Sequence, residues 1–339
     1  MIIVLKPRIS RKEERAVLRE IRKLGYATHV MRGVARTVIG AIGDELTHAN
    51  LETLLAQFPQ AVESVTPIQK RYKLVSREAH PANSTILVRE QVIGGKKLHV
   101  MAGPCSVESE DQLLRTAEAV KAAGATILRG GAFKPRTSPY EFQGLGEKGL
   151  KLLAKARRVT GLAVITELLS ENHAELVAEY ADIIQIGARN AQNFQLLIAA
   201  AKTGKPVLLK RGLAMKIEEW LLAGEYVLSH ENPHLMFCER GIRTFETYTR
   251  NTLDLSAVPI IKRESHCPVV IDPSQGAGRA DLVTTLSQGA VAMGADALLI
   301  EVHPNPAEAW SDGAQQLSLD GFSQLMKELQ PFIQAAGRV

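Results

Sequence analysis

Eight short apolar runs, alternating with amphipathic segments, occupy the chain from residue 98 onward. Runs of this length that alternate with helical patterns indicate parallel strands joined by helices. The runs are residues 98–102, 125–128, 162–166, 182–186, 206–209, 235–237, 268–271 and 297–300. Eight such units predict an α/β fold, a (β/α)8 TIM barrel over residues 85–339. A doubly wound open sheet is the alternative, but no Gly-x-Gly-x-x-Gly motif follows any run.

The first 68 residues have a different pattern, in the order strand, helix, strand, strand, helix, strand. The predicted strands are residues 1–6, 27–31, 37–42 and 61–68, and the predicted helices are residues 11–24 and 49–58. This βαββαβ order predicts a small ferredoxin-like (ACT-like) domain over residues 1–68. The polar residues 69–84 are interpreted as a linker, and residues 86–100 as a hairpin around Gly94 and Gly95.

Composition limits the class of protein further. The 339 residues are 45% hydrophobic and 23% charged, which is ordinary globular usage and excludes a largely disordered or fibrous chain. The apolar runs are far shorter than the roughly 20 residues of a membrane span. The apolar start of the chain meets Lys6 too soon for a signal peptide. We therefore expect a cytoplasmic protein without a membrane partner, and three free cysteines rather than disulfides.

The net charge of +5 does not indicate a nucleic-acid-binding protein. The excess lies in residues 1–73, which hold 13 lysines and arginines against 7 acidic residues. A basic helix surface in a small domain is most often simply solvated. Aromatic residues make up only 5% of the chain, too few for stacking platforms. We expect no nucleic-acid partner.

Basic residues follow several of the predicted barrel strands. In a barrel the carboxyl ends of the strands meet at one mouth, where active sites lie. Guanidinium and ammonium groups at such density repel one another unless anions compensate them, and they suit phosphate and carboxylate oxygens. The mouth therefore predicts polyanionic substrates. Its basic residues are Arg129, Lys134, Arg136, Arg189, Lys210, Arg211, Arg240 and Arg243.

A second group of strand-end residues suits a divalent metal. Cys105 follows the first barrel strand, Glu301 ends the eighth, and Asp312 lies in the loop beyond it. A thiolate with two carboxylates is a plausible donor set for Zn, Fe or Mn. Taken alone, Cys105 has the alternative interpretation of a small buried thiol. His303 has the alternative of a hydrogen-bonded structural histidine.

Together these motifs resemble 3-deoxy-D-arabino-heptulosonate 7-phosphate (DAHP) synthase, in the type I beta branch that carries an N-terminal ferredoxin-like regulatory domain. The resemblance covers nearly the whole chain, and its motifs come in the right order on successive strands. The motifs are Ala-Gly-Pro-Cys105-Ser, Leu-Arg129-Gly-Gly-Ala-Phe-Lys134-Pro-Arg136-Thr137-Ser-Pro, Ile-Gly-Ala-Arg189-Asn, Leu-Lys210-Arg-Gly, Cys-Glu-Arg240-Gly-Ile-Arg and Ile-Glu301-Val-His-Pro.

The resemblance implies condensation of phosphoenolpyruvate with erythrose 4-phosphate, the first step of the shikimate pathway to aromatic amino acids. It implies that Arg129 and Lys134 hold the phosphoenolpyruvate carboxylate and that Arg136 and Thr137 hold the aldose phosphate. The phosphoenolpyruvate phosphate would be held by Arg189, Lys210, Arg240 and the backbone of Ala188. The candidate catalytic residues are Lys134, Cys105, Glu167 and His303.

Regulation and assembly follow from the same resemblance. The N-terminal domain is expected to regulate the barrel, with tyrosine or phenylalanine as the effector. The assembly is expected to be a homotetramer. The cofactor is expected to be a divalent metal, Mn, Fe, Co or Zn.

One position departs from the family pattern. After the seventh strand the family has Asp-Pro-Ser-His, with the histidine as a metal ligand, whereas this chain has Gln275. The predicted metal set is therefore Cys105, Gln275, Glu301 and Asp312, with the metal weakly bound. His303 lies two residues beyond Glu301 and could offer a substitute nitrogen.

Two alternatives remain open. One is an enzyme similar to 3-deoxy-D-manno-octulosonate 8-phosphate synthase, a related barrel that uses arabinose 5-phosphate. The motif from Lys134 to Thr137 and the N-terminal module favour the heptulosonate enzyme over it. The other is a metal-impaired barrel that binds ligands and regulates a partner, for which Gln275 is the only support.

Overall fold

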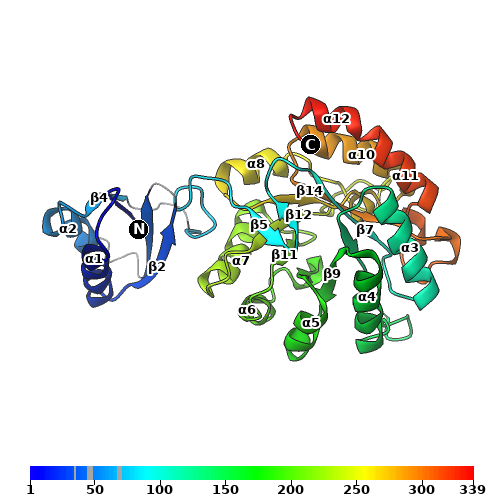
Figure 1. The fold of residues 1–339 in the computed structure, drawn as a ribbon, viewed down its shortest axis with the longest axis horizontal. Helices are drawn as coiled ribbons and strands as arrows, with labels where there is room; N and C mark the ends of the chain where they lie inside the picture. The colour runs from blue at the N-terminus through cyan, green and yellow to red at the C-terminus, as the bar shows by residue number, and fades with distance from the viewer. Residues whose placement is uncertain (34–35, 44–48, 67–70, 137) are drawn as a thin grey trace. The chain divides into compact units, whose positions relative to one another are not determined.

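The computed structural model describes residues 1–33, 36–43, 49–66, 71–136 and 138–339 (Figure 1). The chain divides into two compact units. One consists of residues 1–82 with residues 264–266, and the other of residues 83–263 with residues 267–339. The domain boundaries predicted above, 1–68, 69–84 and 85–339, remain a proposal.

The N-terminal unit has the predicted ferredoxin-like order. Its elements are β1 (Ile2–Leu5), α1 (Arg11–Lys23), β2 (Ala27–Arg32), β3 (Thr37–Ile42), α2 (Ala49–Gln57) and β4 (Val62–Thr66). The antiparallel sheet has the order β2-β3-β1-β4. Helix α1 begins with a capping box, in which Ser10 and Glu13 satisfy each other's backbone N–H groups. The buried face of α1 packs against the sheet together with α2, in a core that includes Ile3, Ile21 and Leu54.

The second unit is a closed barrel of eight parallel strands, as predicted. The strands are β7 (His99–Gly103), β8 (Ile127–Arg129), β9 (Ala163–Leu168), β10 (Ile183–Ile186), β11 (Val207–Lys210), β12 (Leu235–Glu239), β13 (Val269–Ile271) and β14 (Ala297–Glu301). Every strand overlaps an apolar run of the sequence, because strands buried on both faces are continuously hydrophobic. The register Glu301 to Gly103 between β14 and β7 closes the barrel.

Helices surround the barrel (Figure 1). They are α3 (Glu110–Ala122), α4 (Glu147–Thr160), α5 (Ala174–Tyr180), α6 (Phe194–Lys202), α7 (Ile217–Ser229), α8 (Ala257–Glu264), α9 (Pro273–Ala277), α10 (Ala280–Ala292), α11 (Leu319–Glu328) and α12 (Gln330–Ala335). Ser109 caps α3 by accepting a hydrogen bond from Gln112 N at 3.1 Å. Among the described residues, no helix is both long and apolar enough to span a membrane.

The hairpin before the barrel differs from the prediction in its turn and in its extent. It consists of β5 (Ile86–Val88) and β6 (Gln91–Ile93), and its turn is at residues 89–90, where Arg89 has a φ of 54°. Gly94 and Gly95 instead follow the hairpin, and residues 99–100 belong to the barrel. The buried side chains of Ile86, Val88 and Ile93 join the core cluster of the barrel strands. The hairpin thus closes the end of the barrel opposite the strands' carboxyl ends.

Part of the segment interpreted as a linker is packed rather than solvated. Leu74 and Val75 are fully buried, and Ser76 forms a bridge with Ser265. The Nε2 nitrogen of His266 donates to the carbonyl oxygen of Leu74 at 2.8 Å. Most of residues 69–84 are polar, so the sequence pattern did not predict that these apolar residues are buried. Removing their apolar surface from water stabilises the folded chain.

Acid should destabilise this packing through His266. Burial lowers the pKa of His266 from its ordinary value to about 4. Between pH 4 and the ordinary histidine pKa, the unfolded chain therefore binds more protons than the folded one. The contribution of His266 to the free energy of unfolding is fully present above about pH 6.5. It is lost as the pH decreases toward 4, by about 3 kcal/mol in all. Urea-unfolding midpoints measured across this range should show a shallower acid loss for His266→Gln. The partly exposed His230→Gln should behave like the unmodified protein, and equal slopes for all three would contradict this origin.

Candidate active site

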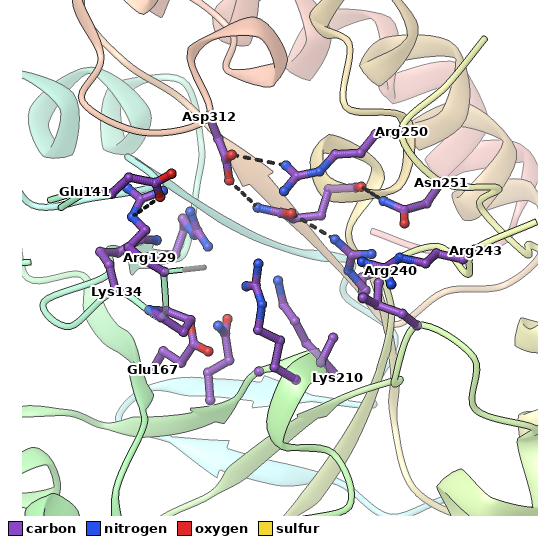
Figure 2. A pocket seen from close by; sticks show the side chains of 18 residues that line it. Arg129, Lys134, Glu141, Glu167, Lys210, Arg240, Arg243, Arg250, Asn251 and Asp312 are labelled. Atoms are coloured by element: carbon purple, nitrogen blue, oxygen red, sulfur yellow. Dashed lines mark hydrogen bonds and ion pairs between the residues drawn. The ribbon is translucent and has the colours of Figure 1, made fainter. Parts of the chain in front are cut away.

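A cavity of about 370 Å³ lies at the carboxyl ends of the barrel strands. Figure 2 shows side chains from several strand ends that converge on it. Its described lining contains eight basic residues and three acidic ones, so its charge suits polyanions. Of the predicted residues, the structure brings together at this cavity Arg129, Lys134, Arg136, Glu167, Ala188, Arg189, Lys210, Arg240, Arg243, Gln275 and Asp312.

Two of the arginines have N–H groups that lack a protein acceptor. Arg129 ends β8, is buried, and donates through Nη1 to Glu301 Oε1 at 2.8 Å and to Pro104 O at 3.2 Å. Arg136 donates through Nε to Phe142 O at 3.0 Å. Within the described part of the chain, Arg129 Nε and Arg136 Nη2 are buried without a hydrogen-bond partner. Buried donors of this kind need an explanation, and an anionic ligand supplies one.

Lys210 and Arg240 are positioned by contacts with a carboxylate and an amide group, respectively. Lys210 Nζ contacts Asp272 Oδ2 at 2.5 Å, and Asp272 also caps α9 by accepting from Gln275 N at 2.9 Å. Arg240 donates to Gln275 Oε1 at 2.9 Å. Burial lowers the pKa of Arg240, because its surroundings do not fully compensate the lost hydration. A bound phosphate would supply the missing negative charge.

Arg211, the neighbour of Lys210, does not reach the cavity. It donates to Glu239 Oε2 at 2.9 Å and to Asp254 Oδ2 at 2.8 Å. Glu239 in turn accepts from Gly241 N at 2.6 Å. The basic residue predicted at this strand end therefore fixes the turn that carries Arg240, rather than lining the mouth.

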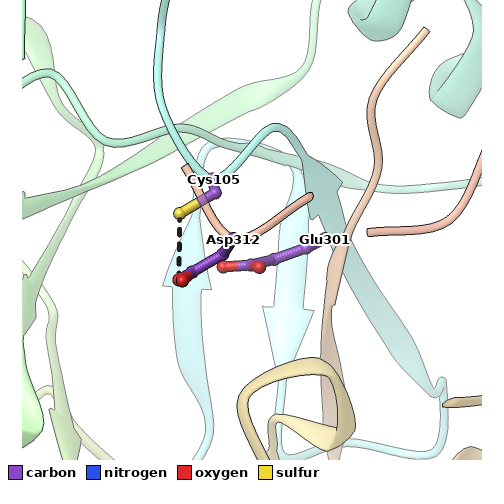
Figure 3. A group of neighbouring side chains, drawn as sticks. All are labelled: Cys105, Glu301 and Asp312. Carbon is purple, nitrogen blue, oxygen red and sulfur yellow. Dashed lines mark hydrogen bonds between the residues drawn. The ribbon is translucent and has the colours of Figure 1, made fainter. Parts of the chain in front are cut away.

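Figure 3 shows Cys105, Glu301 and Asp312 together, with one ligand atom from each lying within 4.8 Å of the others. Cys105 Sγ is 3.5 Å from Asp312 Oδ2 and 3.1 Å from Lys134 Nζ. Burial raises the pKa of the Cys105 thiol, and the charge of Glu301 raises it further. Burial alone would raise the pKa of Asp312, but Arg250, Lys134 and the hydrogen bonds from Gln275 and Cys105 together outweigh it, and the pKa is about 2. These three residues fit a divalent transition metal.

Gln275, the fourth predicted ligand, presents the wrong end of its side chain to the metal group. Its Nε2 donates to Glu301 Oε1 at 3.1 Å and to Asp312 Oδ2 at 3.0 Å. Its oxygen, the only atom that could ligate a cation, accepts from Arg240. Ligation by this oxygen, as predicted from the sequence, would require Arg240 to release it.

His303 does not supply a substitute nitrogen. It is buried, with Nε2 donating to Glu108 Oε2 at 3.2 Å and Nδ1 accepting from Asn305 N at 3.1 Å. Both ring nitrogens are thus engaged, and His303 is absent from the metal group that the described residues form. These contacts favour the alternative of a hydrogen-bonded structural histidine, and the catalytic role stays a prediction. Thr137 lies outside the described residues.

Lys134 and Glu167 lie on the wall next to Cys105. Burial lowers the pKa of Lys134, but the nearby acidic groups of Cys105, Glu167 and Glu301 together outweigh it, so the net pKa is raised and the side chain is an ammonium group. Lys134 is half-buried, and its Nζ donates to Cys105 O at 3.1 Å. This position makes Lys134 a proton donor that a substrate in the cavity can reach.

Several residues of the site were not predicted from the sequence. Arg250 donates to Asp312 Oδ1 at 3.1 Å and to Gln315 Oε1 at 3.0 Å, and Gln315 donates to Glu301 Oε2 at 2.7 Å. Asn251 donates to the backbone oxygen of Gln275 at 3.0 Å. The long loop after the sixth strand contains three arginines, which was the available signal. No motif in the sequence indicated Gln315.

The fold and the site define a class of protein. It is a (β/α)8-barrel enzyme for phosphorylated or carboxylated substrates, with a thiol and two carboxylates suited to a metal and a ferredoxin-like unit attached. Residues 76–335 match the DAHP synthetase I family, and residues 1–70 match the DAHP synthase ferredoxin-like domain. The chain belongs to the DAHP synthetase I family.

Individual relatives agree with this assignment. The chain is 50% identical to phospho-2-dehydro-3-deoxyheptonate aldolase of Thermotoga maritima over 339 residues, which cover 99% of each protein. A crystal structure of the Thermotoga maritima enzyme matches 99% of this chain and 98% of its own with a TM-score of 0.79. A 2-dehydro-3-deoxyphosphooctonate aldolase of Caulobacter vibrioides is 36% identical over 69% of this chain and 87% of its own length.

The position of the Glu167 carboxylate depends on Gly187. A Cβ atom on Gly187 would lie 1.9 Å from Glu167 Oε1, while the Gly187 φ of −70° suits any residue. Gly187→Ala should therefore fold normally but displace the carboxylate, and DAHP formation should fall about 10- to 100-fold, as small misplacements in active sites do.

Steady-state kinetics and the melting temperature of Gly187→Ala test this. Gly95→Ala is the matched control, because its Cβ meets ordinary contacts of 3.5 Å or more. Unchanged kinetics in Gly187→Ala would show that the position of Glu167 is unimportant.

Proposed function

We propose that this protein condenses phosphoenolpyruvate with erythrose 4-phosphate to give DAHP and inorganic phosphate, the first step of the shikimate pathway. The observation that carries the proposal is the cavity with eight basic side chains, two of which have buried N–H groups without a protein acceptor among the described residues. Two phosphates and a carboxylate require such a site. Similarity over the whole chain to a relative named phospho-2-dehydro-3-deoxyheptonate aldolase supports the choice of reaction.

The two substrates are assigned to different parts of the cavity. Arg129 and Lys134 hold the phosphoenolpyruvate carboxylate, near the unpaired Arg129 Nε. Arg136 and Thr137 hold the phosphate of the aldose. The phosphate of phosphoenolpyruvate is held by Arg189, Lys210, Arg240 and the backbone of Ala188. In this assignment the negative charge of the phosphate compensates the buried Arg240, whose lowered pKa reflects its lost hydration.

In the reaction, C3 of phosphoenolpyruvate attacks the aldehyde carbon and forms the new carbon–carbon bond. The aldehyde oxygen becomes a hydroxyl by taking a proton, which Lys134 Nζ is placed to give. Water adds at C2, and the C2–O bond to phosphate breaks, leaving the ketone. Arg189, Lys210 and Arg240 stabilise the departing phosphate. A divalent metal, Mn, Fe, Co or Zn, held by Cys105, Glu301 and Asp312 would supply Lewis-acid polarisation of the aldehyde.

A second candidate reaction uses arabinose 5-phosphate. The relatives named 2-dehydro-3-deoxyphosphooctonate aldolase support it, but that of Caulobacter vibrioides matches only 69% of this chain. The sequence from Lys134 to Thr137 and the ferredoxin-like unit favour erythrose 4-phosphate. Phosphate release with a panel of phosphorylated aldoses separates the two enzymes. A barrel that only regulates a partner would release none with any aldose.

We also propose that the N-terminal unit regulates the barrel, with tyrosine or phenylalanine as the effector. Its match to the DAHP synthase ferredoxin-like domain supports a regulatory duty. Among the residues that the structure describes, none of those lining the active-site cavity comes from this unit. Binding of the effector between the units of neighbouring subunits would suit a homotetramer.

Arg136→Ala should weaken binding of the aldose much more than that of phosphoenolpyruvate. Loss of a charged hydrogen-bond donor to phosphate raises a KM about 10- to 100-fold, and we expect this for erythrose 4-phosphate. Arg189→Ala is the mirror control, which should raise the KM for phosphoenolpyruvate instead. An equal rise for both substrates in either variant would refute the assigned division of phosphates.

Deletion of residues 1–68 should leave turnover but abolish inhibition by tyrosine or phenylalanine. A solved structure of a truncated form of the Thermotoga maritima synthase matches 79% of this chain at 51% identity, which supports the use of a shortened chain in this test. Initial rates with and without each amino acid test the prediction. A soluble but inactive barrel would assign the unit a structural or catalytic duty.

A further inference from the structure

The carboxamide of Gln275 lies between Arg240 and the metal group. Gln275 is in the first turn of α9, where its backbone N–H is held by Asp272. On one side its Oε1 accepts from Arg240 Nη2 at 2.9 Å. On the other its Nε2 spans Glu301 Oε1 and Asp312 Oδ2, at 3.1 and 3.0 Å. One side chain therefore connects an anion-binding arginine to two metal-binding carboxylates.

The orientation of this carboxamide follows from chemistry. A guanidinium has only donors and a carboxylate has only acceptors. Turning the amide over would set its N–H groups against Arg240 and its oxygen against Glu301 and Asp312. All three hydrogen bonds would be replaced by repulsive contacts. The side chain therefore cannot offer its oxygen to a metal while Arg240 and the carboxylates keep their positions.

The amide nitrogen also uses oxygen atoms that a metal needs. Asp312 Oδ2 accepts from Gln275 and is the oxygen nearest to Cys105 Sγ, at 3.5 Å. Glu301 Oε1 accepts from Gln275 and from Arg129, while Oε2 accepts from Gln315. A cation shared by Cys105, Glu301 and Asp312 must compete with the Gln275 N–H groups for Glu301 Oε1 and Asp312 Oδ2, the pair of oxygens that the carboxamide bridges. Gln315 occupies only the other oxygen of Glu301 and leaves this pair open.

We propose that Gln275 is an internal competitor of the metal and not a ligand. Its N–H groups neutralise the two carboxylates in the absence of a cation, and an entering ion must displace the carboxamide from them. Cys105, Glu301 and Asp312 then hold the ion as a set of three protein ligands, and Gln275 contributes only a cost. This inference deepens the proposed function, since it concerns the metal centre of the same site.

The two roles predict opposite effects of removing the side chain. If Gln275 were a ligand, Gln275→Ala would bind metal more weakly. As a competitor, its removal should tighten Co²⁺ binding about 10-fold, the size of one or two hydrogen bonds to charged groups. Alanine suits this position because it favours a helix and the glutamine is only partly buried. Gln275→Ser, whose hydroxyl is too short to bridge both carboxylates, should act in the same direction.

Co²⁺ binding without substrate is the test. Equilibrium dialysis gives the dissociation constant, and the thiolate-to-cobalt charge-transfer band reports that Cys105 is a ligand. Gln315→Ala is the matched control, because Gln315 also donates to Glu301 but bridges no pair of ligands. The expected result is tighter binding in both Gln275 variants, with the band intact, and no tightening in Gln315→Ala.

Equal or weaker Co²⁺ binding in folded Gln275→Ala and Gln275→Ser would overturn the proposal. Equal tightening in Gln315→Ala would also overturn it, by showing that any lost hydrogen bond to Glu301 has this effect. Because no substrate is present, a protein that fails to condense phosphoenolpyruvate with erythrose 4-phosphate can still pass this test, so failure of the reaction and failure of the inference are distinguishable.

Discussion

Glu301, Asp272 and Glu239 are fully buried below the mouth of the barrel, and each one holds a buried cation. The cations are Arg129, Lys210 and Arg211, each about 5% exposed. An unpaired charge at such a place costs several kcal/mol, so neither member of a pair can be lost without stranding the other. These pairs hold the cationic mouth together in a site where like charges would otherwise repel, and two of the cations, Arg129 and Lys210, still line the cavity.

One of these carboxylates, Glu301, also belongs to the metal group, so the anion site and the metal site share a side chain. Glu301 pairs with Arg129 and also lies beside Cys105 and Asp312. Gln275 connects the other side of the metal group to Arg240. A change in one site therefore alters hydrogen bonds in the other.

The barrel and the ferredoxin-like unit match different sets of relatives. The barrel match extends to octulosonate relatives, whereas the ferredoxin-like unit accompanies the heptulosonate relative along the whole chain. The loop after β8 contributes Arg136 to the cavity, at the place assigned to the aldose. Specificity for the second substrate can therefore differ between relatives without change to the phosphoenolpyruvate site.

The sequence alone determined the barrel, the ferredoxin-like unit and most of the mouth. Apolar runs buried on both faces mark parallel strands, and the carboxyl ends of such strands necessarily meet, so Arg129, Lys210 and Arg240 could be grouped before any coordinates existed. Only the tertiary structure decided which atom of Gln275 faces the carboxylates, that Arg211 points away from the cavity, and that Glu108 engages His303. It also decided that Arg250 reaches Asp312 from a distant loop. These outcomes depend on hydrogen-bond partners far apart in the chain, and no local pattern records a partner.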